Sequence, residues 1–405
     1  MKPTLLPTKI IAKTTKQRFT KYLDANISIN PSIADKAILR FIDTIWKTEN
    51  VLLKGVHKIL FRKPKNPKKI LIFRTGSIGD SICAIPSIIA IGKTYPGASV
   101  DILTNAGREN LVGLYYLLNA KYYRKIIDYY GASKKELFKL LRKEKYDLVV
   151  QLPQVDASFT SLLRDMLIFR GISSSGIGWF VSQLKLFTKT QSKCLVFPNE
   201  NSRLLRFLKE NYFVTGGVEA ELNIQQKDKD VVNSLFLEEN ITVTDKKLCM
   251  VIGAKRPQNR WPIDYFVKVA EYFSSKFKII LIGGKEDSIL AKPLLHIPNL
   301  INFCGKLTPM QSATVLSLCD ITLSNDTGPM HMSYTVGTPT IALFSSRDLP
   351  GKWYPPKQNN NFIFRTENVK CQGCFSETCN DNICMKAILP EKIIAVINNY
   401  FNFTD

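Results

Sequence analysis

The sequence predicts an α/β protein made of two doubly wound, mostly parallel sheets with a cleft between them. Two long parts of the chain, residues 70–212 and 247–344, each alternate short apolar runs with helix-like segments. Glycine-containing turns follow several of these runs, as they do where a strand passes into a helix at the binding edge of such a sheet. The length of 405 residues exceeds one ordinary core and favours two domains.

The first half opens on the continuous apolar run of residues 70–73, which suits a parallel strand covered on both faces. Residues 171–199 show no clear period and are interpreted as irregular. A polar region over residues 215–246 predicts a connection with a helix near 228–239. Strands of this half are expected at 70–74, 99–103, 125–129 and 147–152, and helices at 81–94, 107–118, 134–144, 158–170 and 200–212.

The second half repeats the same alternation, so two Rossmann-like domains are the most economical architecture. Its strands are expected at 247–253, 277–283, 300–304, 320–325 and 339–344, and its helices at 263–276, 286–296, 308–319, 328–337 and 390–401. The predicted division is an extension at 1–67, a first domain at 68–225, a second domain at 226–389 and a C-terminal helix at 390–405.

The extension is basic and amphipathic. Apolar residues recur at helical spacing over residues 33–60, which predicts one or two helices. The net charge is +22, and residues 1–69 hold 16 Lys or Arg against 4 Asp or Glu. Such a helix either lies on an anionic membrane through residues 33–61 or docks on the protein itself. The N-terminus lacks the apolar core of a secretory signal, and no apolar run is long enough to span a membrane, so a cytoplasmic protein is expected.

The turn after the first strand is the first candidate site. Gly76 and Gly79 permit close backbone approaches, and Asp80 lies at or near the start of the following helix. Ligands of open α/β sheets bind at this edge. Asp80 either caps the helix or takes part in chemistry, and the spacing of the glycines is not the dinucleotide motif.

A second candidate is the stretch Asn325-Asp326-Thr327-Gly328-Pro329-Met330-His331, followed by Gly337-Thr338-Pro339. Its helix start at Thr327 and Gly328 offers free N–H groups and the positive end of a dipole, which bind phosphate without a metal. His331 lies one turn into the helix and can reach the same anion. The alternative is a capped core helix with a packed histidine.

Two further turns carry charge. The loop 252–262 places Lys255, Arg256 and Arg260 after a strand, where they either face a diphosphate or form a solvated basic loop. In the stretch 281–287, Glu286 begins a helix and can accept hydrogen bonds from a ribose diol, or it is only a carboxylate in a first helical turn.

In this order and spacing, the four stretches resemble glycosyltransferase family 9, the bacterial heptosyltransferases of lipopolysaccharide core assembly. The family pattern R-x-S-x-G-D matches Arg74 to Asp80, and G-A…R-W-P matches Gly253-Ala254 and Arg260-Trp261-Pro262. Strand-G-x-x-E matches Gly283 to Glu286, and N-D-T-G-x-x-H…G-T-P matches residues 325–331 and 337–339. The resemblance covers about residues 70–400.

This resemblance implies a GT-B fold and an inverting transfer that needs no catalytic cofactor. By the matching positions, Asp80 is the implied catalytic base, and Arg74 and Ser77 line the acceptor side. The implied donor-binding residues are Gly253, Lys255, Arg256, Asn259, Arg260, Glu286, Asp326, Thr327, Gly328 and His331.

One position departs from the family pattern. The family usually has Lys directly before Arg-Trp-Pro, where it meets the leaving phosphates, whereas this chain has Asn259. Either Lys255, Arg256 or Arg260 supplies the charge, or the donor is not ADP-heptose.

Four cysteines cluster near the C-terminus: Cys371, Cys374, Cys379 and Cys384. Four thiolates this close can hold a structural zinc or iron, and some relatives that glycosylate proteins bind iron through such a set. Reduced structural or redox thiols are the alternative.

The leading hypothesis is therefore a glycosyltransferase that moves a heptose or related sugar from a nucleotide-diphosphate sugar to a cell-surface glycan. The expected acceptor is a phosphorylated or lipid-linked saccharide, because the chain is basic and carries an amphipathic extension. A protein acceptor is the second hypothesis. A nucleic-acid-binding protein has only the charge in its favour, and a nicotinamide dehydrogenase lacks its GxGxxG motif in both halves, so no nucleic-acid partner is expected.

Overall fold

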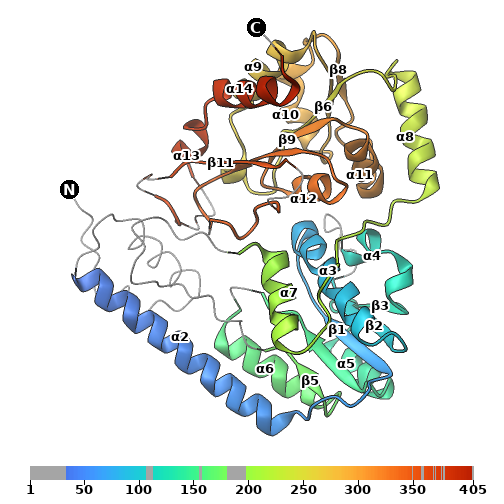
Figure 1. Cartoon of the computed structure of the whole chain (residues 1–405), viewed down its shortest axis with the longest axis vertical. Coiled ribbons are helices and arrows are strands. Elements are labelled where there is room, and N and C mark those ends of the chain that lie inside the picture. The colour runs from blue at the N-terminus through green and yellow to red at the C-terminus, as the bar shows by residue number, and fades with distance from the viewer. Residues whose placement is uncertain are drawn as a thin grey trace.

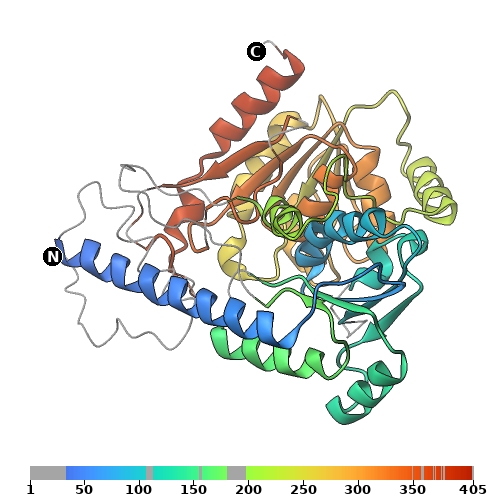
Figure 2. The same ribbon diagram turned by 60° about the horizontal axis from the view of Figure 1, so that its bottom comes forward.

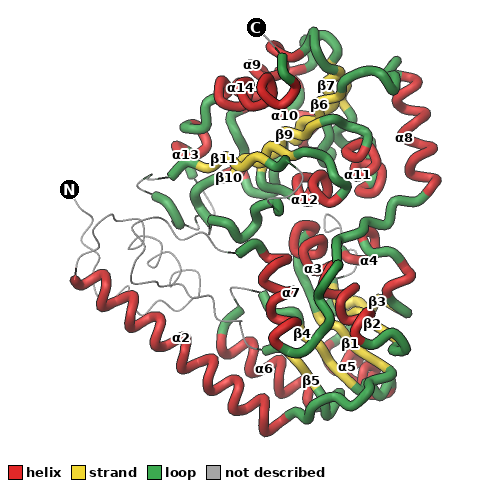
Figure 3. Tube along the Cα trace, viewed as in Figure 1, coloured by secondary structure: helices red, strands yellow, loops and turns green. Residues whose placement is uncertain are grey.

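The protein is described as a computed structural model with two α/β halves, one above the other in Figure 1. In each half the strands form an inner layer and the helices lie outside it (Figure 3). The described residues are 33–105, 113–154, 157–179, 198–348, 350–356, 360–367, 369, 371–374, 376 and 379–403.

The first half contains a parallel sheet with the strand order β3-β2-β1-β4-β5. Its central strand is the apolar run at its start, and Ile70 lies opposite Val100 on one side and Leu148 on the other. The strands are β1 (Lys69–Phe73), β2 (Ser99–Thr104), β3 (Lys125–Asp128), β4 (Leu148–Gln151) and β5 (Gly176–Ile177). The helices are α3 (Ile78–Thr94), α4 (Leu114–Leu117), α5 (Lys134–Lys143), α6 (Phe159–Arg170) and α7 (Glu200–Glu210), with a 3₁₀ turn at Ala120–Tyr122.

The second half contains a parallel sheet with the order β11-β10-β9-β6-β7-β8. Its strands are β6 (Lys247–Val251), β7 (Lys278–Leu281), β8 (Leu300–Asn302), β9 (Ile321–Asn325), β10 (Thr340–Phe344) and β11 (Phe362–Arg365). Its helices are α8 (Gln226–Glu238), α9 (Ile263–Phe273), α10 (Asp287–Leu290), α11 (Pro309–Ser317), α12 (Gly328–Thr335), α13 (Ile383–Lys386) and α14 (Pro390–Phe401), with 3₁₀ turns at Pro257–Asn259 and Lys292–Leu294. The last helix packs on α9 of the same half.

The extension forms one long helix, α2 (Ile33–Leu60), which packs on α6 beside it (Figure 2). Its C-terminal end is fixed to the first half, because Nε2 of His57 lies 2.8 Å from the carbonyl oxygen of Gly176. Just beyond the helix, the ring of Phe61 stacks on Trp179 with 4.6 Å between centroids. The extension therefore docks on the protein at this end. Among the described residues, no helix is both long enough and apolar enough to cross a membrane.

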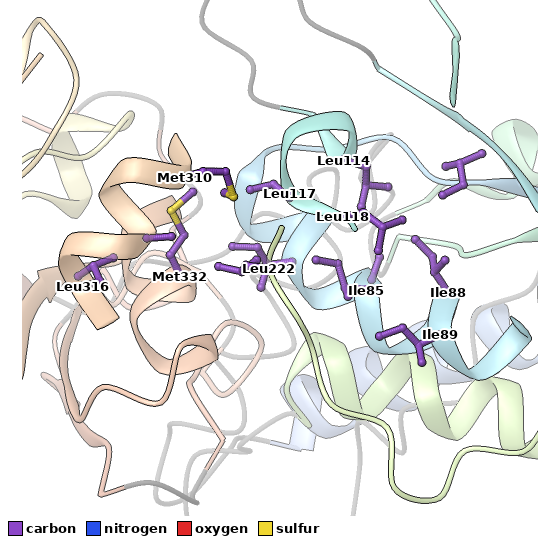
Figure 4. Close-up of a cluster of buried hydrophobic side chains, with 14 of the residues drawn as sticks. Ile85, Ile88, Ile89, Leu114, Leu117, Leu118, Leu222, Met310, Leu316 and Met332 are labelled. Atoms are coloured by element: carbon purple, nitrogen blue, oxygen red, sulfur yellow. The ribbon is translucent and has the colours of Figure 1, made fainter. Parts of the chain in front are cut away.

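The two halves share an apolar contact, which Figure 4 shows in close-up. Met310 of α11 and Met332 of α12 come from the second half, and Leu117 of α4 and Ile85 of α3 come from the first; all four belong to one buried cluster. Helices α3 and α12 also pack directly on each other. Because apolar burial is the main favourable term in such contacts, this cluster holds the starts of α3 and α12 together.

Several elements differ from the sequence-based expectation. The helix expected at 286–296 is wrong as one element: α10 ends at Leu290 and a separate 3₁₀ turn follows, where Pro293 lacks the N–H that a continuing helix needs. Of the helix expected at 107–118, residues 107–112 lie outside the described part, and only Leu114–Leu117 is helical. The short edge strands β5 and β11 were not expected, and α3 begins at Ile78 rather than at 81.

Candidate functional site

A cavity of about 680 Å³ lies between the halves, in the volume range of small-molecule sites. Its lining comes from the glycine turn, Gln154 and the start of α7 on one side, and from five stretches of the second half on the other. These stretches follow β6, β7, β8, β9 and β10, so the cavity lies at the carboxyl edge of the second sheet, where open α/β sheets bind ligands.

Asp80 lies at the wall of this cavity, in the first turn of α3. Its Oδ2 accepts hydrogen bonds from the backbone N–H and from the hydroxyl of Ser77, both 2.9 Å long. Its Oδ1 lies 3.3 Å from a guanidinium nitrogen of Arg74. Position 76, at φ 158°, requires glycine, because a Cβ there would lie 2.3 Å from the Cβ of Asp80. Asp80 thus interacts with the start of the helix and also faces the cavity, so the two roles considered for it are compatible.

Arg74 lies beneath Asp80 rather than on the cavity wall. Only 2% of the residue is exposed, and it is absent from the cavity lining. Its guanidinium donates to the carbonyl oxygen of Leu152 at 3.1 Å and to Oε1 of Glu200 at 3.1 Å. Ser77 does line the cavity. Of the two residues predicted for the acceptor side, Ser77 can contact a ligand and Arg74 contacts Asp80 from beneath.

Glu200 and Arg203 of α7 were not among the residues predicted from the sequence. Both are buried, with 1% and 0% exposed, and both Nε and Nη2 of Arg203 lie 2.7 Å from Glu200 carboxylate oxygens. Burial alone would raise the pKa of the Glu200 carboxyl, but Arg203 and then Arg74 outweigh it and hold that pKa below its ordinary value. The only available signal was an acidic residue at a helix start after Asn199, which is too common to indicate a site.

The start of α12 packs against the start of α3 at the cavity. Thr327 and Gly328 begin α12, and a Cβ on Gly328 would lie 3.0 Å from the side chain of Ile78. His331 is 3% exposed, and its ring lies so close to Gly79 that a Cβ there would be 2.8 Å from Nε2. The helix start expected to bind phosphate is therefore next to the turn that carries Asp80.

Burial lowers the pKa of His331 to about 4, so the imidazole is neutral at pH 7. Its Nδ1 is hydrogen-bonded to the hydroxyl of Tyr334 at 2.8 Å. His331 can therefore offer a ligand one hydrogen bond, without a positive charge.

Asn259 joins the ends of two strands. Its Nδ2 donates to Oδ2 of Asp326 at 3.0 Å, and its Oδ1 accepts from the hydroxyl of Ser345 at 2.7 Å. Burial, and then the charge of Asp348, raise the pKa of Asp326 to about 7. Asn259, which replaces the usual Lys, is thus a neutral side chain that hydrogen-bonds to Asp326, a carboxyl that is partly protonated at neutral pH.

The cations of the cavity come from three loops. Lys255 and Arg256 line it, as the sequence predicted, whereas Arg260 does not. Arg260 instead donates from Nε to the carbonyl oxygen of Ala254 at 2.9 Å and so braces its own loop. Lys285, Arg347 and Lys352 also line the cavity. The last two lie after β10, in a stretch with no motif to mark it.

Asp287 explains why two glycines occur just after β6 and β7. A Cβ on Gly253 would lie 2.0 Å from its Oδ1, and one on Gly283 would lie 2.5 Å from its Oδ2. That carboxylate also accepts the N–H of Gly284 at 2.8 Å. Glu286, directly before α10, lines the cavity beside it.

The cysteine cluster lies on the second half, away from the cavity lining. Cys371, Cys374 and Cys379 are exposed and Cys384 is buried. The N–H of Asn382 donates to the sulfur of Cys379 at 3.2 Å. Within the described part of the chain, no three His, Cys, Asp or Glu residues are grouped closely enough to hold a metal ion. A four-cysteine metal site therefore stays a prediction.

Comparison with known proteins places this arrangement in a family. The chain is 26% identical over 347 residues to lipooligosaccharide heptosyltransferase 2 of Campylobacter jejuni, a match that covers 81% of this chain and 98% of the relative. A glycosyltransferase family 9 structure from Veillonella parvula superposes with a TM-score of 0.63 at 19% identity, over 82% of this chain and 96% of the other. The ADP-heptose lipopolysaccharide heptosyltransferase II of Escherichia coli superposes with a TM-score of 0.57 at 18% identity, over 82% and 98%.

The structural matches confirm the GT-B fold that the sequence led us to expect. The model of glycosyltransferase family 9 (heptosyltransferase) matches residues 135–384, which is more than half of the chain. The protein is a glycosyltransferase, and the chain belongs to glycosyltransferase family 9.

Proposed function

We propose that this enzyme transfers a heptose or closely related sugar from a nucleotide-diphosphate sugar, ADP-heptose first among the candidates, to a saccharide of the lipopolysaccharide core. The observation that carries the proposal is that Asp80 and the start of α12 line one cavity, with α3 and α12 packed on each other. The names of the relatives support the sugar and the pathway, since one is a lipooligosaccharide heptosyltransferase and another an ADP-heptose heptosyltransferase.

In the proposed reaction, Asp80 accepts the proton of an acceptor hydroxyl. The hydroxyl oxygen then forms a bond to the anomeric carbon, and the bond from that carbon to the phosphate oxygen breaks. Attack from the side opposite the leaving group inverts the configuration. A positioned base contributes about 10²–10⁴-fold to such a step. The nucleoside diphosphate leaves toward the second half.

The leaving diphosphate is stabilised by backbone N–H groups and side-chain cations. Thr327 and Gly328 present the first N–H groups of α12, and Lys255 and Arg256 supply positive charge from the loop after β6. Glu286 is placed to accept hydrogen bonds from the ribose. This arrangement requires no metal ion in the transfer step.

Asn259 affects which donor is used. Because it is neutral and is occupied by Asp326 and Ser345, it brings no charge to a phosphate. Lys255 and Arg256 remain as cations from the same loop. We keep ADP-heptose as the leading donor and other nucleotide-diphosphate sugars as the alternative.

We also propose that α2 places the first half on an anionic membrane, where a lipid-linked acceptor would lie. Phe41, Leu52 and Ile59 recur at a spacing of eleven and seven residues, which puts them on one stripe, and they are 55%, 53% and 85% exposed. Lys54 and Lys58 of the same helix are also exposed. A helix with an exposed apolar stripe and exposed cations suits an anionic lipid interface.

Vesicle sedimentation tests this surface. Full-length protein should bind vesicles that contain phosphatidylglycerol more tightly than pure phosphatidylcholine, and L52D with I59D should reduce that binding. V243D is the matched control, because Val243 is 97% exposed on the second half. Equal vesicle binding by the double variant and the wild type would contradict the proposal that α2 binds the membrane.

A protein acceptor stays the second candidate, and no observation on the described residues favours it over a saccharide. The expectation that the protein has no nucleic-acid partner stays a prediction. The cytoplasmic location also stays a prediction. The proposed function is tested by a donor panel of ADP-, GDP- and UDP-sugars with a lipopolysaccharide-core acceptor, followed by analysis of the product. We expect turnover with an ADP-sugar and an inverted anomeric linkage. Turnover with none of the donors would contradict the proposal.

A further inference from the structure

We propose that Glu200 is a positioning residue that acts on the catalytic base Asp80 through Arg74. The inference rests on the proposed function, because it takes Asp80 to be the base. Glu200 comes from α7, 120 positions after Asp80 in the chain. It is brought to the base only by the fold of the first half.

The bridge is defined by its hydrogen bonds. One nitrogen of Arg74, Nη2, lies 3.3 Å from Oδ1 of Asp80 and 3.1 Å from Oε1 of Glu200. The other terminal nitrogen of Arg74 donates to the carbonyl oxygen of Leu152. With Ser77 on the other oxygen of Asp80, both oxygens of the base are held. The direction of the carboxylate toward the cavity is therefore set by Arg74, and Arg74 is set by Glu200.

The same bridge balances the charge around the base. A guanidinium alone beside Asp80 would favour its ionised form and weaken it as a proton acceptor. Glu200 opposes this effect, because it shares the same nitrogen of Arg74. Arg203 in turn pairs with Glu200 at 2.7 Å. Two buried arginines and two carboxylates thus form a neutral set at the cavity wall, in which Asp80 is the more exposed carboxylate.

Glu200 also connects the base to the donor side. Its backbone N–H donates to the carbonyl oxygen of Lys352 at 2.9 Å, and Lys352 lines the cavity from the loop after β10. The start of α7 is therefore tied to both halves. A shift of that loop would move Glu200, and with it the support of Asp80.

Asp326 lines the same cavity and has a pKa raised to about 7, so it titrates in the pH range of the test; it does so in wild type, E200Q and E136Q alike, and the comparison among them isolates the effect of Glu200. Cys83, His331 and Tyr334 do not titrate in that range. Burial raises the pKa of Cys83 to about 12 and lowers that of His331 to about 4, and burial holds the pKa of Tyr334 well above its ordinary value. The groups that face Asp80 or its bridge are Arg74 from the strand end, Cys83 from α3, Glu200 and Arg203 from α7, His331 and Tyr334 from α12, and Lys352 from the loop after β10.

The experiment compares wild type, E200Q and E136Q in sugar transfer between pH 5 and 9. Glu136 is also a carboxylate in the first turn of a helix of the first half, but it is exposed and makes only local bonds to Ser133, so E136Q is the matched control. In E200Q, Arg74 faces Asp80 without the opposing charge of Glu200, and Arg203 loses its carboxylate partner. We expect the acidic limb of the kcat/KM profile to move about 1–2 pH units lower, with kcat at pH 8 reduced about tenfold and donor KM unchanged.

An E200Q profile with its acidic limb unmoved, in a folded protein, overturns the inference. If E200Q does not fold, R74K tests the same bridge, because an ammonium group cannot span both carboxylates with Arg geometry. R74K should lose kcat and keep its affinity for ADP, and unchanged kcat overturns the inference. D80N separates the two proposals: an active D80N overturns the proposed base and this inference together, whereas an inactive D80N with an unmoved E200Q profile overturns the inference alone.

Discussion

Gly79 lies directly before Asp80 and packs against His331 of the second half, so Gly79→Ala perturbs the contact between the halves beside the proposed base. An added Cβ would lie 2.8 Å from two ring atoms of His331, whereas ordinary contact begins near 3.4 Å. The ring or α3 would have to move by about 0.6 Å. His331 is buried and bonded to Tyr334, so it cannot turn away freely. Such overpacking costs about 1–3 kcal/mol.

This cost falls on the arrangement in which α3 packs on α12. Ala is favoured over Gly inside a helix by about 0.5–1 kcal/mol, which offsets part of the loss. A net loss of about 1.4 kcal/mol in that arrangement would lower transfer about tenfold. Steady-state transfer and ADP binding by calorimetry provide the assay. We expect kcat to fall, with a smaller effect on ADP affinity, because the residues proposed to bind ADP belong to the second half.

Gly92→Ala is the control, since Gly92 lies in the same helix and nothing comes within 4 Å of its added Cβ. That variant should gain about 0.5–1 kcal/mol in unfolding free energy and keep its activity. If G79A is as stable and as active as G92A, the packing of α3 on α12 does not govern the reactive state, and the reasoning is refuted.

The remaining predictions concern a carboxyl and the cysteines. Asp326 should keep its proton in the folded state up to about pH 7, whereas the unfolded chain loses it near 3.8, so stability should fall as pH rises between these values. The unfolding free energy of wild type should fall between pH 5 and pH 8, and D326N should remove about 2–4 kcal/mol of that fall, measured by chemical denaturation at both pH values. An equal change in unfolding free energy in D326N and wild type would contradict the raised pKa. The four-cysteine hypothesis predicts about one zinc or iron ion per chain by elemental analysis and its loss in Cys374→Ser; metal-free wild type would rule the site out.

The central strands and the first turn after each of them were predictable, because their signals are local. Apolar runs such as residues 70–73 and 247–251 form buried strands whatever else the chain does. The edge strands β5 and β11 were not predictable. Strand β5 has only two residues, and β5 and β11 each depend on one neighbouring strand for their hydrogen bonds. Pro293 did carry a signal that the predicted helix 286–296 overlooked.

The residues of the candidate site were also predictable only where their signals are local. Asp80, Thr327 and Gly328 follow strand ends, so the edge rule placed them correctly at the cavity. Glu200 and Lys352 could not be assigned, because each lies in a stretch without a motif and reaches the cavity only through contacts between distant segments. Motif matching alone also put Arg74 and Arg260 at the ligand, whereas both are absent from the cavity lining and bond to groups of the protein.

The role of Asp80 is tested most directly by single-turnover transfer in D80N, with ADP affinity measured on the same preparation. Asparagine keeps the size of the side chain and removes its ability to accept the proton of a hydroxyl. We predict that D80N binds ADP as wild type does and transfers sugar at least about 10²-fold more slowly. Transfer by D80N at a rate near that of the wild type would contradict the account.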